Sequence, residues 1–146
     1  MTEQNAYQVA DWNGQSGEYW VANQARLDAM FAVFGQAAIE AAAPATGERV
    51  LDVGCGAGAS SLALAARVGA GGQVLGVDIS EPLIGRARAL APQDTPALFR
   101  VADASSAELP EGAFDILFSR FGVMFFDDPT GAVSYTHLTL PTNREV

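Results

Sequence analysis

The chain has 146 residues, of which 49% are hydrophobic and 17% are charged, and its formal net charge is −9. This balance excludes a disordered chain and predicts one soluble globular domain with a real core. The acidic charge argues against a nucleic-acid surface, because neutralising phosphates needs a basic patch. The N-terminus lacks a signal-peptide pattern and no apolar run approaches the ~20 residues that span a bilayer, so the sequence predicts a cytoplasmic protein without membrane contact.

The first part of the chain is predicted to precede the central sheet. Residues 7–19 are aromatic, polar and glycine-bearing, which predicts an irregular arm. From about Trp20 to Ala42, apolar side chains recur at helical spacing and predict a helix. This apolar stripe either simply packs on the fold or, with the arm, forms a lid over a ligand, in which case Trp20 and Tyr19 are the residues of interest. The stripe consists of Leu27, Met30, Phe31, Phe34 and Ala38.

Residues 49–61 predict a buried strand, a glycine turn and the start of a helix in immediate succession. Asp52 interrupts the apolar strand, and a carboxylate is costly there unless it is paired or lies at the strand's carboxyl end, where open α/β sheets bind ligands. Gly54, Gly56 and Gly58 permit positive φ angles and close approach of a ligand, and the following helix directs free N–H groups at the same place. The stretch is therefore predicted to cradle a ligand.

An ordinary tight turn between a strand and a helix remains the alternative, because short glycine motifs have false positives. Gly54-x-Gly56-x-x-Ala59 satisfies the permissive dinucleotide fingerprint, and Asp78 ends the next apolar run, where it would bind two ribose hydroxyls. Asp52 lies where a dinucleotide-binding turn usually carries an apolar residue. This position favours a different nucleoside.

The rest of the chain alternates helices with strands, which is typical of a parallel α/β sheet. Helices are predicted over residues 60–68 and about 81–91, the second capped by Ser80 with Pro82 in its first turn. Strands are predicted over residues 73–78, 98–101 and 114–119. The helix side chains expected to face the sheet are Leu62, Leu64, Ala65, Val68, Leu83, Ile84, Ala87 and Leu90, while Arg86 and Arg88 are expected on a solvated face.

Two candidate ligand-binding residues also have simpler structural explanations. Cys55 is the only cysteine, so it forms no internal disulfide, and it has no metal-ligand neighbour; the simplest interpretation is a small residue in a tight turn. Asp103 follows the third strand and is either one more turn acid or, beside Asp78, a ligand-binding acid. No metal site is predicted.

Four segments, in order and spacing, resemble the successive motifs of class I S-adenosylmethionine-dependent methyltransferases. The resemblance covers roughly residues 7–132 and is closest to the bacterial small-molecule type, similar to quinone-biosynthesis methyltransferases. It implies a Rossmann-like, doubly wound parallel sheet with strand order 3-2-1-4 in the part present. The motifs are residues 50–58, 77–80, 101–104 and 114–120.

The resemblance also implies roles for individual residues toward S-adenosylmethionine. Asp78 would bind the ribose hydroxyls, the turn from Gly54 to Gly58 (including Cys55 and Gly56) the methionine portion, and Asp52 its amino group. Asp103 would accept from the adenine amino group, the Ala104 N–H would meet a ring nitrogen, and Ile79 would lie against the ring. Ser119 would lie where the acceptor meets the sulfonium, and Trp20 in the lid. No catalytic base can be named.

The segment from Val133 onward is predicted not to belong to the domain. Residues 133–143 back-translate without a gap as GTC TCT TAT ACA CAT CTG ACG CTG CCG ACG A, which is identified as a transposase-library sequencing adapter. His137, the only histidine, is therefore excluded from any mechanism. The expected division is an N-terminal arm and helix over 1–46, a truncated cofactor-binding core over 47–132 and an artefactual tail over 133–146. Truncation would expose an apolar edge formed by residues 114–118 and 123–126.

Three functions follow from these observations. The first is methyl transfer from S-adenosylmethionine to a small-molecule acceptor that the sequence does not identify. The second is a nicotinamide-dependent oxidoreductase of Rossmann fold, which the turn and Asp78 alone would allow but which Asp52 and Asp103 do not support. The third is a non-catalytic nucleoside-binding fragment. Neither a nucleic-acid partner nor an oligomeric state is predicted.

Overall fold

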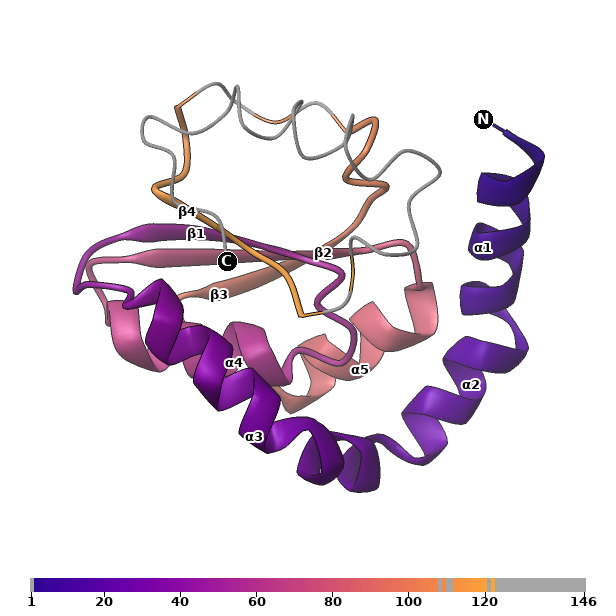
Figure 1. Cartoon of the computed structure of the whole chain (residues 1–146), viewed down its shortest axis with the longest axis horizontal. Coiled ribbons are helices and arrows are strands. Elements are labelled where there is room, and N and C mark those ends of the chain that lie inside the picture. Colours follow the sequence, from indigo (N-terminus) through magenta and orange to yellow (C-terminus); the bar gives the residue numbers. More distant parts are fainter. Residues whose placement is uncertain (1, 108, 110–111, 121, 123–146) are drawn as a thin grey trace.

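The computed structural model describes residues 2–107, 109, 112–120 and 122. Three helices come first, and strands then alternate with helices (Figure 1). The C-terminal segments considered above, including the apolar residues 123–126 and His137, lie outside the described residues. The elements are α1 (Glu3–Asn13), α2 (Gln15–Ala22), α3 (Gln24–Ala42), β1 (Arg49–Val53), α4 (Ala59–Val68), β2 (Gln73–Asp78), α5 (Glu81–Leu90), β3 (Ala97–Val101) and β4 (Ile116–Phe118).

The four strands form one parallel sheet in the order β3-β2-β1-β4, which confirms the predicted topology. In β1, Asp52 pairs with Gly76 of β2 on one side and with Phe118 of β4 on the other. All pairs are parallel, so the carboxyl ends of the strands meet at one edge of the sheet. In open α/β sheets this edge is where ligands bind.

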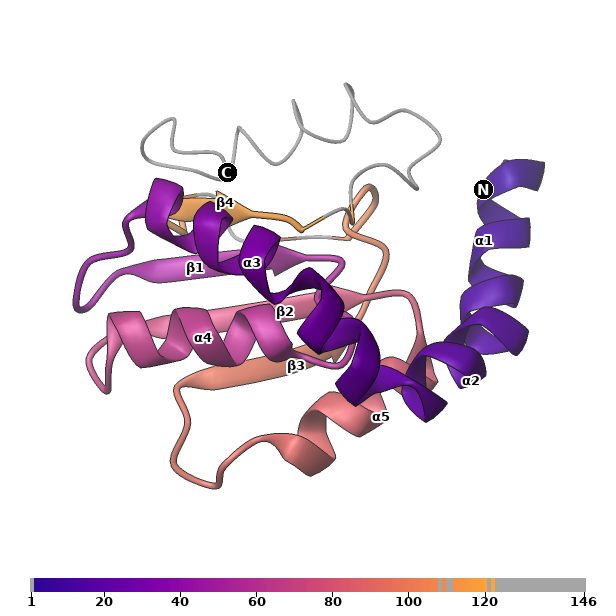
Figure 2. The same ribbon diagram turned by 60° about the horizontal axis from the view of Figure 1, so that its bottom comes forward.

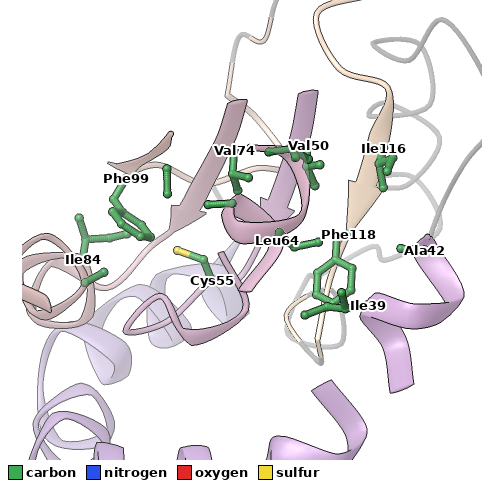
Figure 3. Close-up of a cluster of buried hydrophobic side chains, with 14 residues drawn as sticks. Ile39, Ala42, Val50, Cys55, Leu64, Val74, Ile84, Phe99, Ile116 and Phe118 are labelled. Carbon is green, nitrogen blue, oxygen red and sulfur yellow. The ribbon is translucent and has the colours of Figure 1, made fainter. Parts of the chain in front are cut away.

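Helices α3, α4 and α5 cover one face of the sheet (Figure 2). A continuous apolar cluster fills the space between them, and Figure 3 shows Phe118 of β4 against Ile39 of α3, with Leu64 of α4 nearby. Phe118, Leu64, Ile84, Val50 and Val74 are fully buried. Burial of such side chains is the main driving force that holds the helices on the sheet.

The opposite face of the sheet is covered in part by the segment that joins β3 to β4. Leu51, Val53, Val77 and Leu117 of the strands form a second apolar cluster with Ala104, Leu109 and Phe114 of that segment. The predicted exposed edge is therefore wrong for the described part, because Phe114, Ile116, Leu117 and Phe118 are all buried. Side chains from β4 pack on both faces of the sheet, which accounts for this burial.

The N-terminal arm is helical, which corrects the prediction that residues 7–19 are irregular. Thr2 caps α1 by accepting a hydrogen bond from the backbone N–H of Asn5, and Gly14 separates α1 from α2. Gly17 of α2 is buried, and a Cβ there would collide with the backbone carbonyl of Trp12. Its glycine thus serves helix packing rather than an irregular loop.

The apolar stripe predicted on the following helix is only partly correct. Met30 and Phe34 are 58% and 62% exposed, respectively. The inward face of α3 is instead a narrower line on which the small residues Gly35 and Ala42 allow close packing, while Phe31 and Ala38 of the predicted stripe are partly buried. The inward residues of α3 are Leu27, Gly35, Ile39 and Ala42, and Leu27 is the only member of the predicted stripe among its buried residues.

The later elements match their predicted positions closely, with small corrections. β2 has the predicted bounds, and Ser80 caps α5 by accepting from the Leu83 N–H. Leu90, predicted to face the sheet, is 39% exposed. Arg88, predicted to be solvated, donates to the Phe99 carbonyl at 2.8 Å. None of the described helices has the length and apolarity that a membrane span requires.

Candidate active site at the carboxyl edge of the sheet

A pocket of about 350 Å³ lies at the carboxyl edge of the sheet. Its size is within the range of small-molecule sites, about 300–1,000 Å³. The floor comes from the β1–α4 turn and from the ends of β2 and β3, and the N-terminal helices stand beside the same edge (Figure 1). The lining residues are Asn5, Trp12, Trp20, Asp28, Phe31, Val53, Gly54, Cys55, Gly56, Ala57, Ala59, Val77, Asp78, Ile79, Leu83, Ala102, Asp103, Ala104, Arg120 and Gly122.

The β1–α4 turn is held rigidly against β2. The backbone N–H groups of Gly54 and Cys55 both donate to the Val77 carbonyl, at 2.9 and 3.1 Å. Gly56 has φ +56°, and a Cβ built there would meet no atom within 4 Å. The turn therefore presents open backbone to the pocket at Gly56.

Cys55 is part of the pocket lining, but its side chain packs in the apolar core cluster (Figure 3) and its thiol is not activated for chemistry. Burial, followed by the negative charges of Asp52 and Asp78, raises the pKa of Cys55 well above its ordinary value. A thiol that stays protonated is a poor nucleophile. This environment suits the structural interpretation of Cys55 as a small residue in a tight turn.

Asp78 joins β2 to the glycine turn. Its Oδ2 accepts from the Gly56 N–H at 2.9 Å, and its Oδ1 accepts from the Ser80 N–H at 3.0 Å. Burial raises the pKa of the Asp78 carboxyl, although the hydrogen bonds from Ser80 and Gly56 act in the opposite direction. The sequence placed this acid beside the turn, and the structure brings the two together.

Asp103 and Ala104 line the pocket beyond the end of β3. Partial burial raises the pKa of Asp103, but hydrogen bonds from Ser105 and Asn5 outweigh burial and hold this pKa below its ordinary value. One of these bonds runs from Asn5 Nδ2 to Asp103 Oδ2, at 3.0 Å, and so joins α1 to the strand end. Asp103 is an ionised group that faces the pocket.

Asp52 lies beneath the pocket rather than in its lining. The side chain is fully buried, and its Oδ2 accepts from the hydroxyl groups of Ser60 and Ser61, each at 2.7 Å. Its Oδ1 has no hydrogen-bond partner among the described residues. Burial raises the pKa of Asp52 to about 6, against the lowering effect of the two serines. The carboxylate therefore fixes the start of α4 beneath the turn.

Two other predicted site residues also lie outside the lining. Gly58 has φ +91°, and a Cβ there would be 2.9 Å from the ring of Phe99, so this glycine serves packing against β3. Ser119 donates its hydroxyl to the Val53 carbonyl at 2.8 Å, which fastens the end of β4 to the end of β1. Both residues support the site from outside the pocket.

The N-terminal helices border the pocket and are attached to the β2–α5 connection. Asn13 Nδ2 donates to the Ile79 carbonyl at 2.8 Å, and Asn13 Oδ1 accepts from the Glu81 N–H at 2.8 Å. The Ser80 hydroxyl donates to the Trp12 carbonyl. These bonds position the α1–α2 junction over the end of β2.

Three aromatic side chains from these helices line the pocket. The rings of Trp12 and Trp20 meet edge to face with centroids 5.8 Å apart, and the rings of Trp20 and Phe31 are nearly parallel at 6.2 Å. Tyr19, the other residue singled out in the predicted lid, is 54% exposed and does not line the pocket. The pocket therefore has an aromatic wall on its helical side.

Sequence reasoning missed four polar or aromatic residues of the lining: Asn5, Trp12, Asp28 and Arg120. Trp12 and Arg120 lie within segments that the sequence associated with the site, but nothing in the local pattern gave either residue a role. Asn5 and Asp28 carry no local signal at all. Their positions follow from the packing of α1 and α3 near the strand ends.

The fold and the pocket define an open α/β protein of Rossmann-like type, with a ligand site where parallel strands end beside a glycine turn. The chain belongs to the methyltransferase domain family, whose model matches residues 50–139. This match confirms the family that the four sequence motifs indicated.

Individual relatives agree with this assignment. Aklanonic acid methyltransferase DauC of Streptomyces sp. (strain C5) is 36% identical over 71% of this chain and 48% of its own length. 2-Methyl-6-phytyl-1,4-hydroquinone methyltransferase of Synechocystis is 38% identical over 66% of this chain and 29% of its own length. The chain thus spans about half, or less, of the length of these relatives.

A solved structure shows the same architecture. Phosphoethanolamine N-methyltransferase 2 of Haemonchus contortus, in complex with phosphomonomethylethanolamine and S-adenosylhomocysteine, superposes with a TM-score of 0.64 and 30% identity. The match covers 73% of this chain and 25% of that protein.

Proposed function

We propose that this domain binds S-adenosylmethionine and transfers its methyl group to a small-molecule acceptor. The observation that carries the proposal is the junction of Asp78 with the glycine turn at the floor of the pocket, where the carboxylate is 2.9 Å from the Gly56 N–H. Bound S-adenosylhomocysteine in the related Haemonchus enzyme and the methyltransferases among the curated relatives support the same cofactor here.

The pocket residues suit the parts of this cofactor. Asp78 would bind the ribose hydroxyls, and Ile79, Asp103 and Ala104 would surround the adenine. Open backbone at Gly56 leaves room for the sulfur-bearing chain. Asp52, which lies below the lining, would act through the turn that it supports and not by direct contact.

The protein's contribution to the reaction is alignment. A sulfonium supplies an already activated methyl group when the cofactor is bound, so no covalent protein intermediate is required. Holding the acceptor in line with that methyl group can supply roughly 7–11 kcal/mol of barrier reduction. A rigid turn bonded to Val77 and an aromatic wall from Trp20 and Phe31 provide fixed surfaces for such positioning.

We also propose that the acceptor is a small molecule and not a nucleic acid. Residues 1–46 would form a lid over the cofactor-binding core, which begins at residue 47. The net charge of −9 disfavours a phosphate-rich partner. The relatives named above are methyltransferases of aklanonic acid and of a hydroquinone. The N-terminal helices supply three aromatic rings to the pocket wall, and such rings suit a planar organic acceptor.

The decisive experiment is calorimetric titration of the chain with S-adenosylhomocysteine and, separately, with NAD. Asp78→Ala is expected to weaken binding of S-adenosylhomocysteine by about a hundredfold, because it removes charged hydrogen bonds to two hydroxyl groups. Asp78→Asn keeps an acceptor for the Ser80 N–H but not for the Gly56 N–H, so it reports the loss of the charge together with the loss of one bond to the turn.

Asp94→Ala is the matched control, since Asp94 is exposed in the α5–β3 connection and does not line this pocket. The affinity of Asp94→Ala for S-adenosylhomocysteine should equal that of the wild type. Preferential binding of NAD, or unchanged binding of S-adenosylhomocysteine by Asp78→Ala, would contradict the proposed function.

A further inference from the structure

The guanidinium of Arg120 lies in the pocket wall. The side chain is only 17% exposed, and among the described residues it forms an ion pair with the Asp28 carboxylate, in which Nη2 and Oδ1 are 4.0 Å apart. That distance is too long for a hydrogen bond. Within the described part of the chain, the hydrogen bonds include none from the five guanidinium donors of Arg120. A mostly buried cation of this kind is stabilised by an acceptor that enters the pocket.

Helix α3 is shaped to let this side chain reach the pocket. Gly35 is buried on the inward face of α3, and a Cβ there would lie 3.1 Å from Nη1 and 3.5 Å from Cδ of Arg120. A larger residue at position 35 would crowd the guanidinium. The arginine therefore extends along α3 toward Asp28, which stands two turns earlier on the same helix.

The charges of the pocket are distributed unevenly. Among the described lining residues, Arg120 is the one cation, whereas Asp28, Asp78 and Asp103 are acidic. Asp78 and Asp103 lie at the ends of β2 and β3 and accept hydrogen bonds from neighbouring backbone or side-chain groups. Arg120 and Asp28 form a separate pair on the β4 and α3 side, where a cation and an anion are presented together.

This pair lies on the side of the pocket that adjoins the glycine turn. Gly122, two residues after Arg120, is so close to Gly54 that a Cβ on Gly54 would be 2.5 Å from its Cα. Arg120 also lowers the pKa of Asp52, the buried acid two residues before Gly54. The Arg120 guanidinium is thus near the glycine turn, on the β4 side of the sheet and away from β3.

We propose that Arg120 and Asp28 together bind the amino-acid end of the cofactor, the guanidinium holding its carboxylate and the Asp28 carboxylate its ammonium group. This inference rests on the proposed function. A guanidinium binds a carboxylate through two parallel hydrogen bonds, which lysine cannot reproduce. Asp28 Oδ2 already accepts from Gln24 at 2.6 Å, so Oδ1 is the atom available to the ammonium group.

The test compares two nucleosides that differ only at this end. S-Adenosylhomocysteine carries the charged amino-acid group, and 5′-methylthioadenosine has the same nucleoside and thioether without it. Arg120→Gln is expected to weaken binding of S-adenosylhomocysteine at least about tenfold. Its affinity for 5′-methylthioadenosine should stay within about twofold of the wild-type affinity. Asp28→Asn should show the same selective loss.

Arg67→Gln is the matched control, because it removes one positive charge from an exposed position on α4 outside the pocket. It should change neither affinity. If Arg120→Gln weakened binding of both nucleosides equally, the arginine would only shape the pocket. If it changed neither affinity, the arginine would serve another ligand, such as an acidic acceptor. Either result overturns the proposal. A wild-type chain that binds neither nucleoside would refute the proposed function itself.

Discussion

Replacing Gly54 with alanine is expected to lower the free energy of unfolding by about 3–5 kcal/mol. Gly54 has φ +70°, which costs an L-residue about 1–2 kcal/mol, and its new Cβ would lie 2.5 Å from the Cα of Gly122. Neither side of this contact can move freely, because hydrogen bonds tie Gly54 and Cys55 to Val77 and Ser119 to Val53. The overlap must therefore be relieved by shifting backbone.

Gly56→Ala is the matched control for this substitution, since Gly56 also has a positive φ but no atom lies within 4 Å of its Cβ position. Its cost should be confined to the backbone conformation, about 1–2 kcal/mol. Urea unfolding of both variants, followed by circular dichroism, measures the difference. If both variants lost the same free energy of unfolding, the close contact between Gly54 and Gly122 would add no cost to the substitution.

Replacing Asp52 with asparagine is expected to remove a pH dependence of about 3 kcal/mol. The pKa of Asp52 is about 6 in the folded chain and 3.8 in its unperturbed state. Between these values the folded chain keeps a proton that the unfolded chain has released, so the free energy of unfolding falls as the pH rises. The total loss is about 1.4 kcal/mol for each unit of pKa difference.

Denaturant unfolding of both proteins from about pH 4 to about pH 7 tests this prediction. Other carboxyl groups titrate in both proteins, so the informative quantity is the stability of Asp52→Asn minus that of the wild type, which should rise through this window and level off above it. Parallel curves would mean that the buried carboxyl has the same pKa in both states. Ser60 and Ser61 supply hydroxyl partners for an amide as well as for a carboxylate.

The strand, turn and helix around Gly54 were predictable because their signals are local. An apolar run, three glycines and a helical spacing of Leu64 and Val68 each act over a few residues, and the structure has β1 and α4 at these positions. The meeting of Asp78 with the turn also followed, since parallel strands bring their carboxyl ends to one edge. Short-range rules together with the sheet topology therefore predicted the floor of the pocket.

The helical side of the pocket could not be predicted in this way, because long-range packing determines it. The arm became α1 and α2 through Thr2 capping and through contacts with the β2–α5 connection. Met30 and Phe34 fit a helical stripe equally well whether they face inward or outward, and the packing of Gly35 and Ile39 decided the rotation of α3. The pairing of Arg120 with Asp28 joins the segment after β4 to α3, and these two are far apart in the sequence.

The attachment of α1 determines how the pocket can open. Helix α1 buries none of its own residues, and its side-chain and carbonyl hydrogen bonds join Asn5, Trp12 and Asn13 to residues just beyond the ends of β2 and β3. Segments with few buried apolar contacts open at a small fraction of the global unfolding free energy. We therefore expect the amide protons of α1 to exchange with solvent faster than those of β1, and local detachment of α1 would admit a ligand without any strand leaving the sheet.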